Sequence, residues 1–231
     1  MEKKITICAC SSRSFIDKNK VARLAAVTKA AGWDVEVVHD LCQLAEDKNE
    51  RMGDIAKRVV AGCSERAMKS LVEFCGEEPG MLLNIRSNDA DEVVKEIGIE
   101  PASLDLSEID RYTSEYNDSV SAFPRKWGED AWYPVIDKDV CGECGKCLDF
   151  CPFGVYEMVE DRIRVVHPHN CKNNCPACAR TCPAGAIIFP KYDHSPINGG
   201  VESEESAVML DTKTLYSKAF KERLEARRLK R

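Results

Sequence analysis

Eight of the 13 cysteines form two near-copies of one pattern in the C-terminal half of the chain, and each copy ends in Cys-Pro. Two, two and three residues separate the cysteines of the first run, and three, two and three separate those of the second. Thiolates are the soft ligands that iron–sulfur clusters need, and this spacing is typical of two [4Fe–4S] clusters. The sequence therefore predicts one-electron chemistry at these residues. The eight cysteines are Cys141, Cys144, Cys147, Cys151, Cys171, Cys175, Cys178 and Cys182.

The two runs are an internal repeat with an offset of 31 residues. The segment C-x3-C-P-F-G-V-Y, which begins at Cys147, aligns with C-x3-C-P-A-G-A-I, which begins at Cys178. Short spacings turn the chain around a metal, so three cysteines of each run can surround one cluster. The second run departs from the first between Cys171 and Cys175, where three residues stand in place of two. We expect this extra residue to loosen the loop without removing a ligand.

Zinc is the alternative metal, because Cys-x2-Cys pairs also occur in zinc ribbons. A zinc site needs four ligands as two pairs, however, and does not explain two quartets that are each closed by Cys-Pro. His167 and His169 precede the second run and are interpreted as loop residues, since the cysteine quartets are already complete. The aromatic residues near the runs are interpreted as core packing that keeps water from the clusters. They are Trp132, Tyr133, Phe150, Phe153, Tyr156 and Phe189.

Residues 132–190, with their two Cys-Pro runs, resemble the bacterial two-cluster ferredoxins. The resemblance implies a β-α-β-β-α-β fold and low-potential electron transfer. In such ferredoxins the fourth cysteine of each run ligates the other cluster. We therefore assign the cluster ligands crosswise. One cluster is assigned to Cys141, Cys144, Cys147 and Cys182, and the other to Cys171, Cys175, Cys178 and Cys151.

The composition suits a globular protein, since 44% of the 231 residues are hydrophobic. A net charge of -6 argues against nucleic-acid binding. The N-terminal apolar run, Ile5 to Ala9, is too short for a signal peptide or a membrane span. We therefore expect no membrane span and a cytoplasmic chain, in which reduced thiols are available to bind metal.

Apolar runs alternate with amphipathic segments over residues 1–100, which predicts a parallel sheet in a three-layer α/β domain. We expect four strands, at Ile5–Ala9, Val35–Val38, Arg58–Ala61 and Met81–Ile85. We expect helices at Lys18–Ala31, Asp47–Asp54, Ser64–Phe74 and Asp89–Ile97.

Three further segments complete the predicted organisation. Residues 101–130 are interpreted as a connector with one helix around residues 107–116, and residues 131–192 as an α+β two-cluster domain. Residues 193–231 are interpreted as a linker and a C-terminal helix. From Lys213 onward this tail has eight basic and two acidic residues. It is interpreted as a solvated helix or as a docking element for an acidic partner or membrane surface.

Four of the five remaining cysteines follow predicted strands, which suggests a third site. Cys8 and Cys10 close the first strand, Cys42 follows the second, and Cys63 follows the third. Ligands of open parallel sheets bind at the carboxyl ends of the strands. Three loops would thus bring four thiols together, the number that a further [4Fe–4S] cluster requires.

A second resemblance is carried by Cys8-Ala-Cys10, Asp40-Leu-Cys42, the segment 59–66 (VVAGCSER) and the segment 83–86 (LNIR). With these segments, residues 4–86 resemble the N-terminal domain of the A subunit of heterodisulfide reductase. In that family a large flavin domain follows, but no Gly-x-Gly-x-x-Gly motif occurs here, so we infer neither flavin binding nor heterodisulfide chemistry. The resemblance supports the third cluster.

Other interpretations of the N-terminal cysteines remain open. Free cysteine is among the most buried residue types, so these residues could be core side chains, as we interpret Cys75. Cys8 and Cys10 could instead form a redox-active dithiol. His39 could replace one ligand, although a lone histidine is more often structural.

These patterns predict an electron-transfer subunit or adaptor for a partner oxidoreductase, which the second resemblance suggests is a flavin enzyme. One alternative is an enzyme that cleaves disulfides at the N-terminal cysteines. Another is an iron–sulfur redox sensor.

Overall fold

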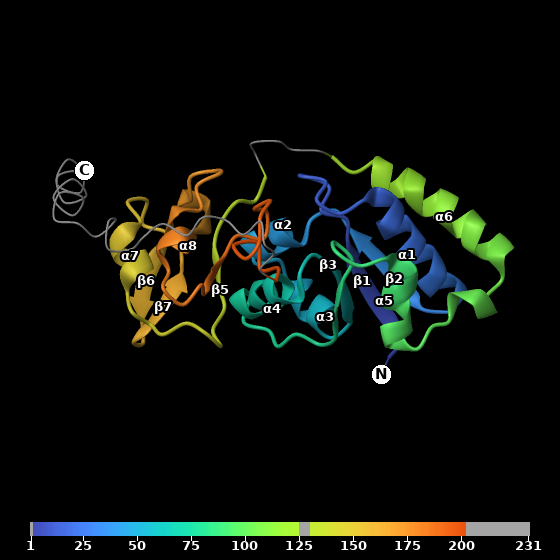
Figure 1. Cartoon of the computed structure of the whole chain (residues 1–231), viewed down its shortest axis with the longest axis horizontal. Helices are drawn as coiled ribbons and strands as arrows, with labels where there is room; N and C mark the ends of the chain where they lie inside the picture. Colours follow the sequence, from blue (N-terminus) through green and yellow to red (C-terminus); the bar gives the residue numbers. More distant parts are fainter. Residues whose placement is uncertain (1, 125–129, 202–231) are drawn as a thin grey trace. The chain divides into compact units, whose positions relative to one another are not determined.

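The computed structural model describes residues 2–124 and 130–201 (Figure 1). The chain forms two compact units, which divide between Ala131 and Trp132. Among the described residues, no helix combines the length and the apolar character that crossing a membrane requires. The predicted basic C-terminal helix lies outside the described residues.

The first unit is built on a four-stranded sheet in the order β2-β1-β3-β4, in which all neighbouring strands are parallel. This confirms the parallel sheet predicted from the alternating pattern. Because β1 lies between β2 and β3, the carboxyl ends of the three strands at or after which the four cysteines lie are neighbours at one edge of the sheet. The strands are β1 (Lys4–Cys8), β2 (Asp34–Val38), β3 (Val59–Gly62) and β4 (Leu82–Asn84).

Helices cover both faces of this sheet. Helices α1, α5 and α6 lie on one side, and α2, α3 and α4 on the other (Figure 1). The α-helices are α1 (Lys18–Ala30), α2 (Leu41–Glu46), α3 (Met52–Ala56), α4 (Glu65–Phe74), α5 (Ala90–Val93) and α6 (Leu106–Ser121). Two 3₁₀ helices follow α5, at Val94–Ile97 and Pro101–Ser103.

Helix α1 shows why the prediction from periodicity succeeds. The Asp17 carboxylate caps its first turn by accepting a hydrogen bond from the Asn19 amide at 2.8 Å. The chain then leaves the helix through Gly32, whose φ of 77° is the left-handed conformation that glycine adopts without strain. Val21 and Leu24, which are three residues apart and so share one face of the helix, are fully buried.

The predicted helix over Asp47–Asp54 is wrong, because the structure has α2 before this segment and α3 across its end. Asp40 starts α2 early, since its carboxylate accepts a hydrogen bond from the Cys42 amide at 3.1 Å. Lys48 then has a left-handed φ of 46°, which ends the helical conformation. The two short helices therefore replace one continuous helix.

The first unit also extends beyond residue 100, where we had placed the end of the first domain. Helix α6 lies in the predicted connector and packs along α1, and its Ile109 side chain is fully buried. A buried ion pair fixes the last part of the unit: Arg13 Nε donates to Asp130 Oδ2 at 2.6 Å. Their side chains are only 7% and 0% exposed. Residues 101–124 are therefore part of the folded unit rather than a free connector.

Replacing Asp130 by alanine is expected to lower the free energy of unfolding of the first unit by about 3–5 kcal/mol, because it leaves a buried guanidinium without this carboxylate. Urea denaturation followed by circular dichroism measures the change. Asp91→Ala is the matched control, since Asp91 pairs with Arg23 at 2.8 Å where both side chains are partly exposed. The control should lose less than about 1 kcal/mol. Equal losses in the two variants would contradict the role given to the buried pair.

The second unit has the element order β-α-β-β-α-β, as the ferredoxin resemblance implies. Its first and last strands pair antiparallel, and its two middle strands form a hairpin. Trp132 stacks on Phe189 with ring centroids 5.2 Å apart, which places aromatic packing beside the outer strand pair. The elements are β5 (Val135–Ile136), α7 (Lys146–Phe150), β6 (Tyr156–Val159), β7 (Arg162–Val165), a 3₁₀ turn (Pro168–Asn170), α8 (Ala177–Thr181) and β8 (Ile187–Ile188).

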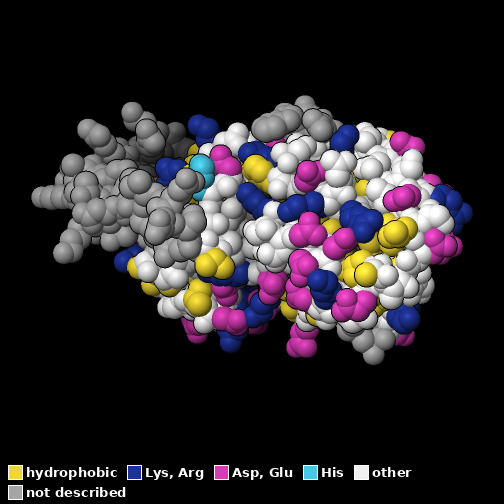
Figure 2. Space-filling model, turned by 45° about the vertical axis from the view of Figure 1, so that its right-hand side comes forward, with side chains coloured by type: hydrophobic (Ala, Val, Ile, Leu, Met, Phe, Trp, Pro, Cys, Tyr) yellow, Lys and Arg dark blue, Asp and Glu magenta, His cyan; other side chains and the backbone are white. Residues whose placement is uncertain are grey.

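Charged side chains of both signs are interspersed over the face seen in Figure 2. Exposed pairs such as Lys95 with Glu92, 2.7 Å apart, contribute little to stability because water and salt screen them. The stability of the first unit therefore depends mainly on its apolar core. The large side chains with almost no exposure there include Ile5, Ile7, Leu24, Leu41, Met52, Ile55, Met68, Leu71, Leu83 and Ile85.

Candidate metal centres

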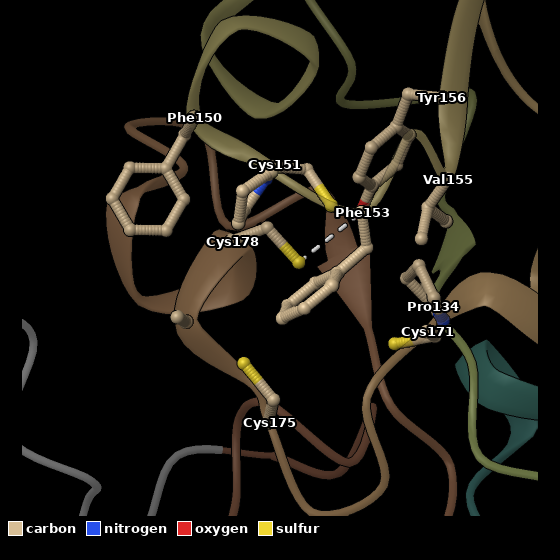
Figure 3. Close-up of a pocket in the computed structure, with 11 residues that line it drawn as sticks. Pro134, Phe150, Cys151, Phe153, Val155, Tyr156, Cys171, Cys175 and Cys178 are labelled. Atoms are coloured by element: carbon tan, nitrogen blue, oxygen red, sulfur yellow. Dashed lines mark hydrogen bonds between the residues drawn. The ribbon is translucent and has the colours of Figure 1, made fainter. Parts of the chain in front are cut away.

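Four cysteines of the second unit line one pocket, and they come from both runs (Figure 3). Three belong to the second run, and the fourth, Cys151, closes the first run. Apart from the Tyr156 side chain, the rest of the lining comes from proline, alanine, valine and phenylalanine residues. The lining cysteines are Cys151, Cys171, Cys175 and Cys178, and the apolar residues are Pro134, Phe150, Pro152, Phe153, Val155 and Ala177.

The backbone of both cysteine loops has a left-handed residue immediately before the second cysteine. Glu143 has a φ of 50° in the first loop, and Asn174 has a φ of 60° in the second. Despite the extra residue in the second loop, the residue before Cys175 thus has the same left-handed backbone conformation as the residue before Cys144. The Glu143 carboxylate also accepts a hydrogen bond from the Ile163 amide at 2.6 Å, which holds the first loop against β7.

A second pair of left-handed residues follows the Cys-Pro steps. Gly154 has a φ of 68° and Gly185, its partner in the repeat, has a φ of 60°. A side chain would be strained at such angles, which explains the glycine shared by the two halves. The turn returns the chain toward the cysteines, and the Ala186 amide donates to Cys182 Sγ at 3.3 Å.

The other four cysteines influence one another electrostatically. The pKa of the Cys147 thiol is raised to about 12, mainly by burial, with smaller contributions from the nearby Cys182 and Cys141. Burial is also the largest cause of the raised pKa of Cys141, and the nearby Cys182 and Cys144 contribute to the same shift. Cys182, which closes the second run, therefore lies close to cysteines of the first run. Such thiols are protonated at neutral pH, so binding a metal there releases protons.

Tyr156 contacts a cysteine directly, which the sequence analysis missed because we interpreted this residue only as core packing. Its hydroxyl donates a hydrogen bond to Cys178 Sγ at 3.1 Å (Figure 3). Both residues are buried, and burial raises the pKa of each well above its ordinary value. The repeat contained a signal for this difference, since Ile187 stands at the position that corresponds to Tyr156.

The donor set of this unit suits iron–sulfur clusters. In the pocket, four thiols offer soft ligands among mostly apolar side chains. Among the residues that the structure describes, no group of three or more His, Cys, Asp or Glu side chains is arranged to hold a single metal ion.

In the first unit, Cys8, Cys10 and Cys42 are buried and Cys63 is partly exposed. Burial raises the pKa of Cys8 well above its ordinary value, and the nearby Cys10, Asp40 and Cys63 add to this effect. The Cys63 pKa is raised to about 11, mainly by burial, while the Arg86 guanidinium lowers it. Cys10 and Cys63 therefore both lie close enough to Cys8 to influence its pKa.

Cys42 lies in the first turn of α2, directly after Leu41, whose amide donates to Cys8 Sγ at 3.3 Å. Cys10 has a left-handed φ of 46°, which is uncommon for a residue with a side chain. His39, the alternative ligand, packs its ring against Phe123 with the ring centroids 6.2 Å apart.

A pocket of about 290 Å³ lies where β1 ends, beside the Cys8-Ala-Cys10 segment. Ala9 and Ser11, the neighbours of Cys10, line it together with residues at the C-terminal end of α6. The structure therefore provides a cavity next to the strand-end thiols. The complete lining is Ala9, Ser11, Ser14, Ile16, Asp17, Lys18, Val120, Ser121 and Phe123.

Comparison with known proteins agrees with the geometry of the second unit. A family model described as a 4Fe–4S dicluster domain matches residues 133–183. An uncharacterized ferredoxin of Methanocaldococcus jannaschii is 36% identical, over 47% of this chain and 74% of that protein. The chain belongs to the ferredoxins. Ferredoxin-3 of Nostoc sp. is 32% identical, over 31% of this chain and 90% of that protein.

This ferredoxin is an iron–sulfur electron-transfer protein, and its dicluster domain, which carries [4Fe–4S] clusters, lies in the second unit. A more distant match is the formate dehydrogenase iron-sulfur subunit of Haemophilus influenzae, which is 34% identical over 27% of this ferredoxin and 22% of that protein. Each of these alignments covers less than half of the chain.

Proposed function

We propose that this ferredoxin is an electron-transfer subunit or adaptor whose eight C-terminal cysteines bind two clusters crosswise. The observation that carries this proposal is the single pocket shared by Cys151 and three cysteines of the second run. In the sequence, 20 positions separate Cys151 from Cys171, so only the folded chain brings them together. The ligand sets are Cys141, Cys144, Cys147 and Cys182 for one cluster, and Cys151, Cys171, Cys175 and Cys178 for the other.

The partner in this proposal is an oxidoreductase. Similarity to the formate dehydrogenase iron-sulfur subunit supports a place beside a catalytic subunit. The resemblance of residues 4–86 to heterodisulfide reductase supports a flavin-containing partner in particular. The chain would accept or deliver electrons one at a time, while the partner would convert the substrate.

The first unit contributes a third cluster in this proposal, held by Cys8, Cys10, Cys42 and Cys63. Support comes from the neighbouring carboxyl ends of β1, β2 and β3 and from the electrostatic proximity of Cys8, Cys10 and Cys63. The buried surroundings of these thiols are suited to a cluster shielded from water.

Counting iron and acid-labile sulfide per chain, after anaerobic reconstitution, tests these sites. We expect about twelve irons in the unchanged chain and about eight in Cys8→Ala, since each cluster holds four. Cys75→Ala is the matched control and should keep about twelve, because Cys75 lies at the end of α4, outside every proposed set. About eight irons in the unchanged chain would rule out the third cluster, and fewer than eight would overturn the two C-terminal ligand sets.

A second candidate function is reduction of a disulfide at the N-terminal thiols, which the adjacent pocket of about 290 Å³ favours. Two one-electron transfers from the clusters and two protons would convert one disulfide into two thiols. Turnover of a small disulfide by the reduced chain without a partner would support this activity. If the chain only passes electrons on, the disulfide should remain intact until a partner enzyme is added.

A further inference from the structure

The two halves of the ferredoxin repeat differ in a buried tyrosine hydroxyl that contacts a cysteine sulfur. Tyr156 and Cys178 are only 2% and 7% exposed, and the tyrosine hydroxyl donates to the sulfur at 3.1 Å. The repeat offset of 31 residues places Ile187 opposite Tyr156 and Cys147 opposite Cys178. Cys147 belongs to the other proposed ligand set, and the residue that corresponds to Tyr156 there is Ile187. The isoleucine side chain has no hydrogen-bond donor.

The backbone fixes the position of the tyrosine. Gly154 turns the chain after Cys151, and the Val155 carbonyl then accepts hydrogen bonds from the Val166 and His167 amides at 3.0 and 3.2 Å. Tyr156 is the first residue of β6, paired with Val165. Its ring is therefore held at the pocket by the hairpin, and the hydroxyl has little freedom to leave the sulfur.

A hydrogen bond to a ligand sulfur changes the reduction potential of a cluster. Reduction adds one negative charge, which is shared by the cluster and its thiolates. A donor in dry surroundings stabilises the more negative form more strongly, because little water competes with it. The hydroxyl therefore favours the reduced state of the cluster that it contacts.

We propose that Tyr156 tunes the cluster held by Cys151, Cys171, Cys175 and Cys178, so that this cluster has the higher potential of the two in the second unit. Electrons that enter the unit then reside preferentially on this cluster. The inference rests on the crosswise ligand sets proposed above, and it states which of the two clusters has the higher reduction potential.

Redox titration of the reconstituted chain, followed by electron paramagnetic resonance, tests the proposal. In Tyr156→Phe the equilibrium constant for reduction of one cluster should fall about tenfold, equal to a shift of about 59 mV toward negative potential. The other cluster of the second unit should keep its midpoint and serves as an internal reference. Iron content is measured on the same samples.

Tyr192→Phe is the matched control, because it removes a hydroxyl from the same unit that accepts from Arg180 Nη2 at 2.7 Å. It should leave both midpoints in place. Unchanged midpoints in Tyr156→Phe with full iron content, or equal shifts of both, would overturn the tuning role while leaving the ligand sets intact. Missing iron in the unchanged chain would instead overturn the ligand sets, and the tuning role with them.

A second measurement covers the case in which Tyr156→Phe loses iron. The unchanged sequence is produced with 3-fluorotyrosine, whose hydroxyl is a stronger donor and whose ring has nearly the same size. The midpoint of the cluster that contacts Tyr156 should then move toward positive potential. A chain whose midpoints all stay in place would contradict the proposal.

Discussion

Replacing both Cys144 and Cys151 by alanine is expected to remove about eight irons per chain, whereas replacing both Cys144 and Cys182 removes only about four. Replacing Cys144 alone should remove about four irons, because Cys144 belongs to one ligand set. Cys182 is proposed to belong to the same set, so its loss adds nothing further. Cys151 is proposed to belong to the other set, with the residues that share its pocket.

This comparison separates crosswise from local ligation. If each run of four cysteines bound its own cluster, the two double variants would exchange their results. The variant that lacks both Cys144 and Cys151 would then lose only about four irons. Iron and acid-labile sulfide counts on anaerobically reconstituted protein give the answer. Adding Cys75→Ala to Cys144→Ala is the control for a second cysteine loss, and should leave the count at the value of the single variant.

Removing the clusters with an oxidant and a chelator is expected to unfold the second unit and to leave the first unit folded. The helices α7 and α8 have five residues each, and the strands β5 and β8 have two. Elements this short are not stable alone, so the free energy of cluster binding must support the fold. The first unit has its own four-stranded sheet and a core of fully buried aliphatic side chains.

Limited proteolysis with mass spectrometry measures this outcome. Cluster-free protein should yield a protected fragment that ends before Trp132, while the cluster-bound chain should also protect residues of the second unit. Far-ultraviolet circular dichroism should retain the helical signal of the first unit. Protection of residues 132–201 without clusters would contradict the role given to the metal in folding.

Local signals predicted several elements within about one residue. The strand predicted at residues 35–38 is β2 at Asp34–Val38, and the helix predicted at residues 18–31 is α1 at Lys18–Ala30. Both depend on periodic burial and on caps next to the element in the sequence. The helix predicted at residues 47–54 failed because the Asp40 cap and the left-handed Lys48 fix its boundaries.

Residue type and spacing were enough to predict the chemistry, because thiolates at short, regular intervals suit iron–sulfur clusters whatever surrounds them. The tertiary structure was needed to bring Cys151 into a pocket with the second run, to pack α6 against α1 and to direct the Tyr156 hydroxyl at Cys178. Each of these features joins segments that are far apart in the sequence. Their proximity depends on how the whole chain packs, and the spacing of residues within one segment does not determine it.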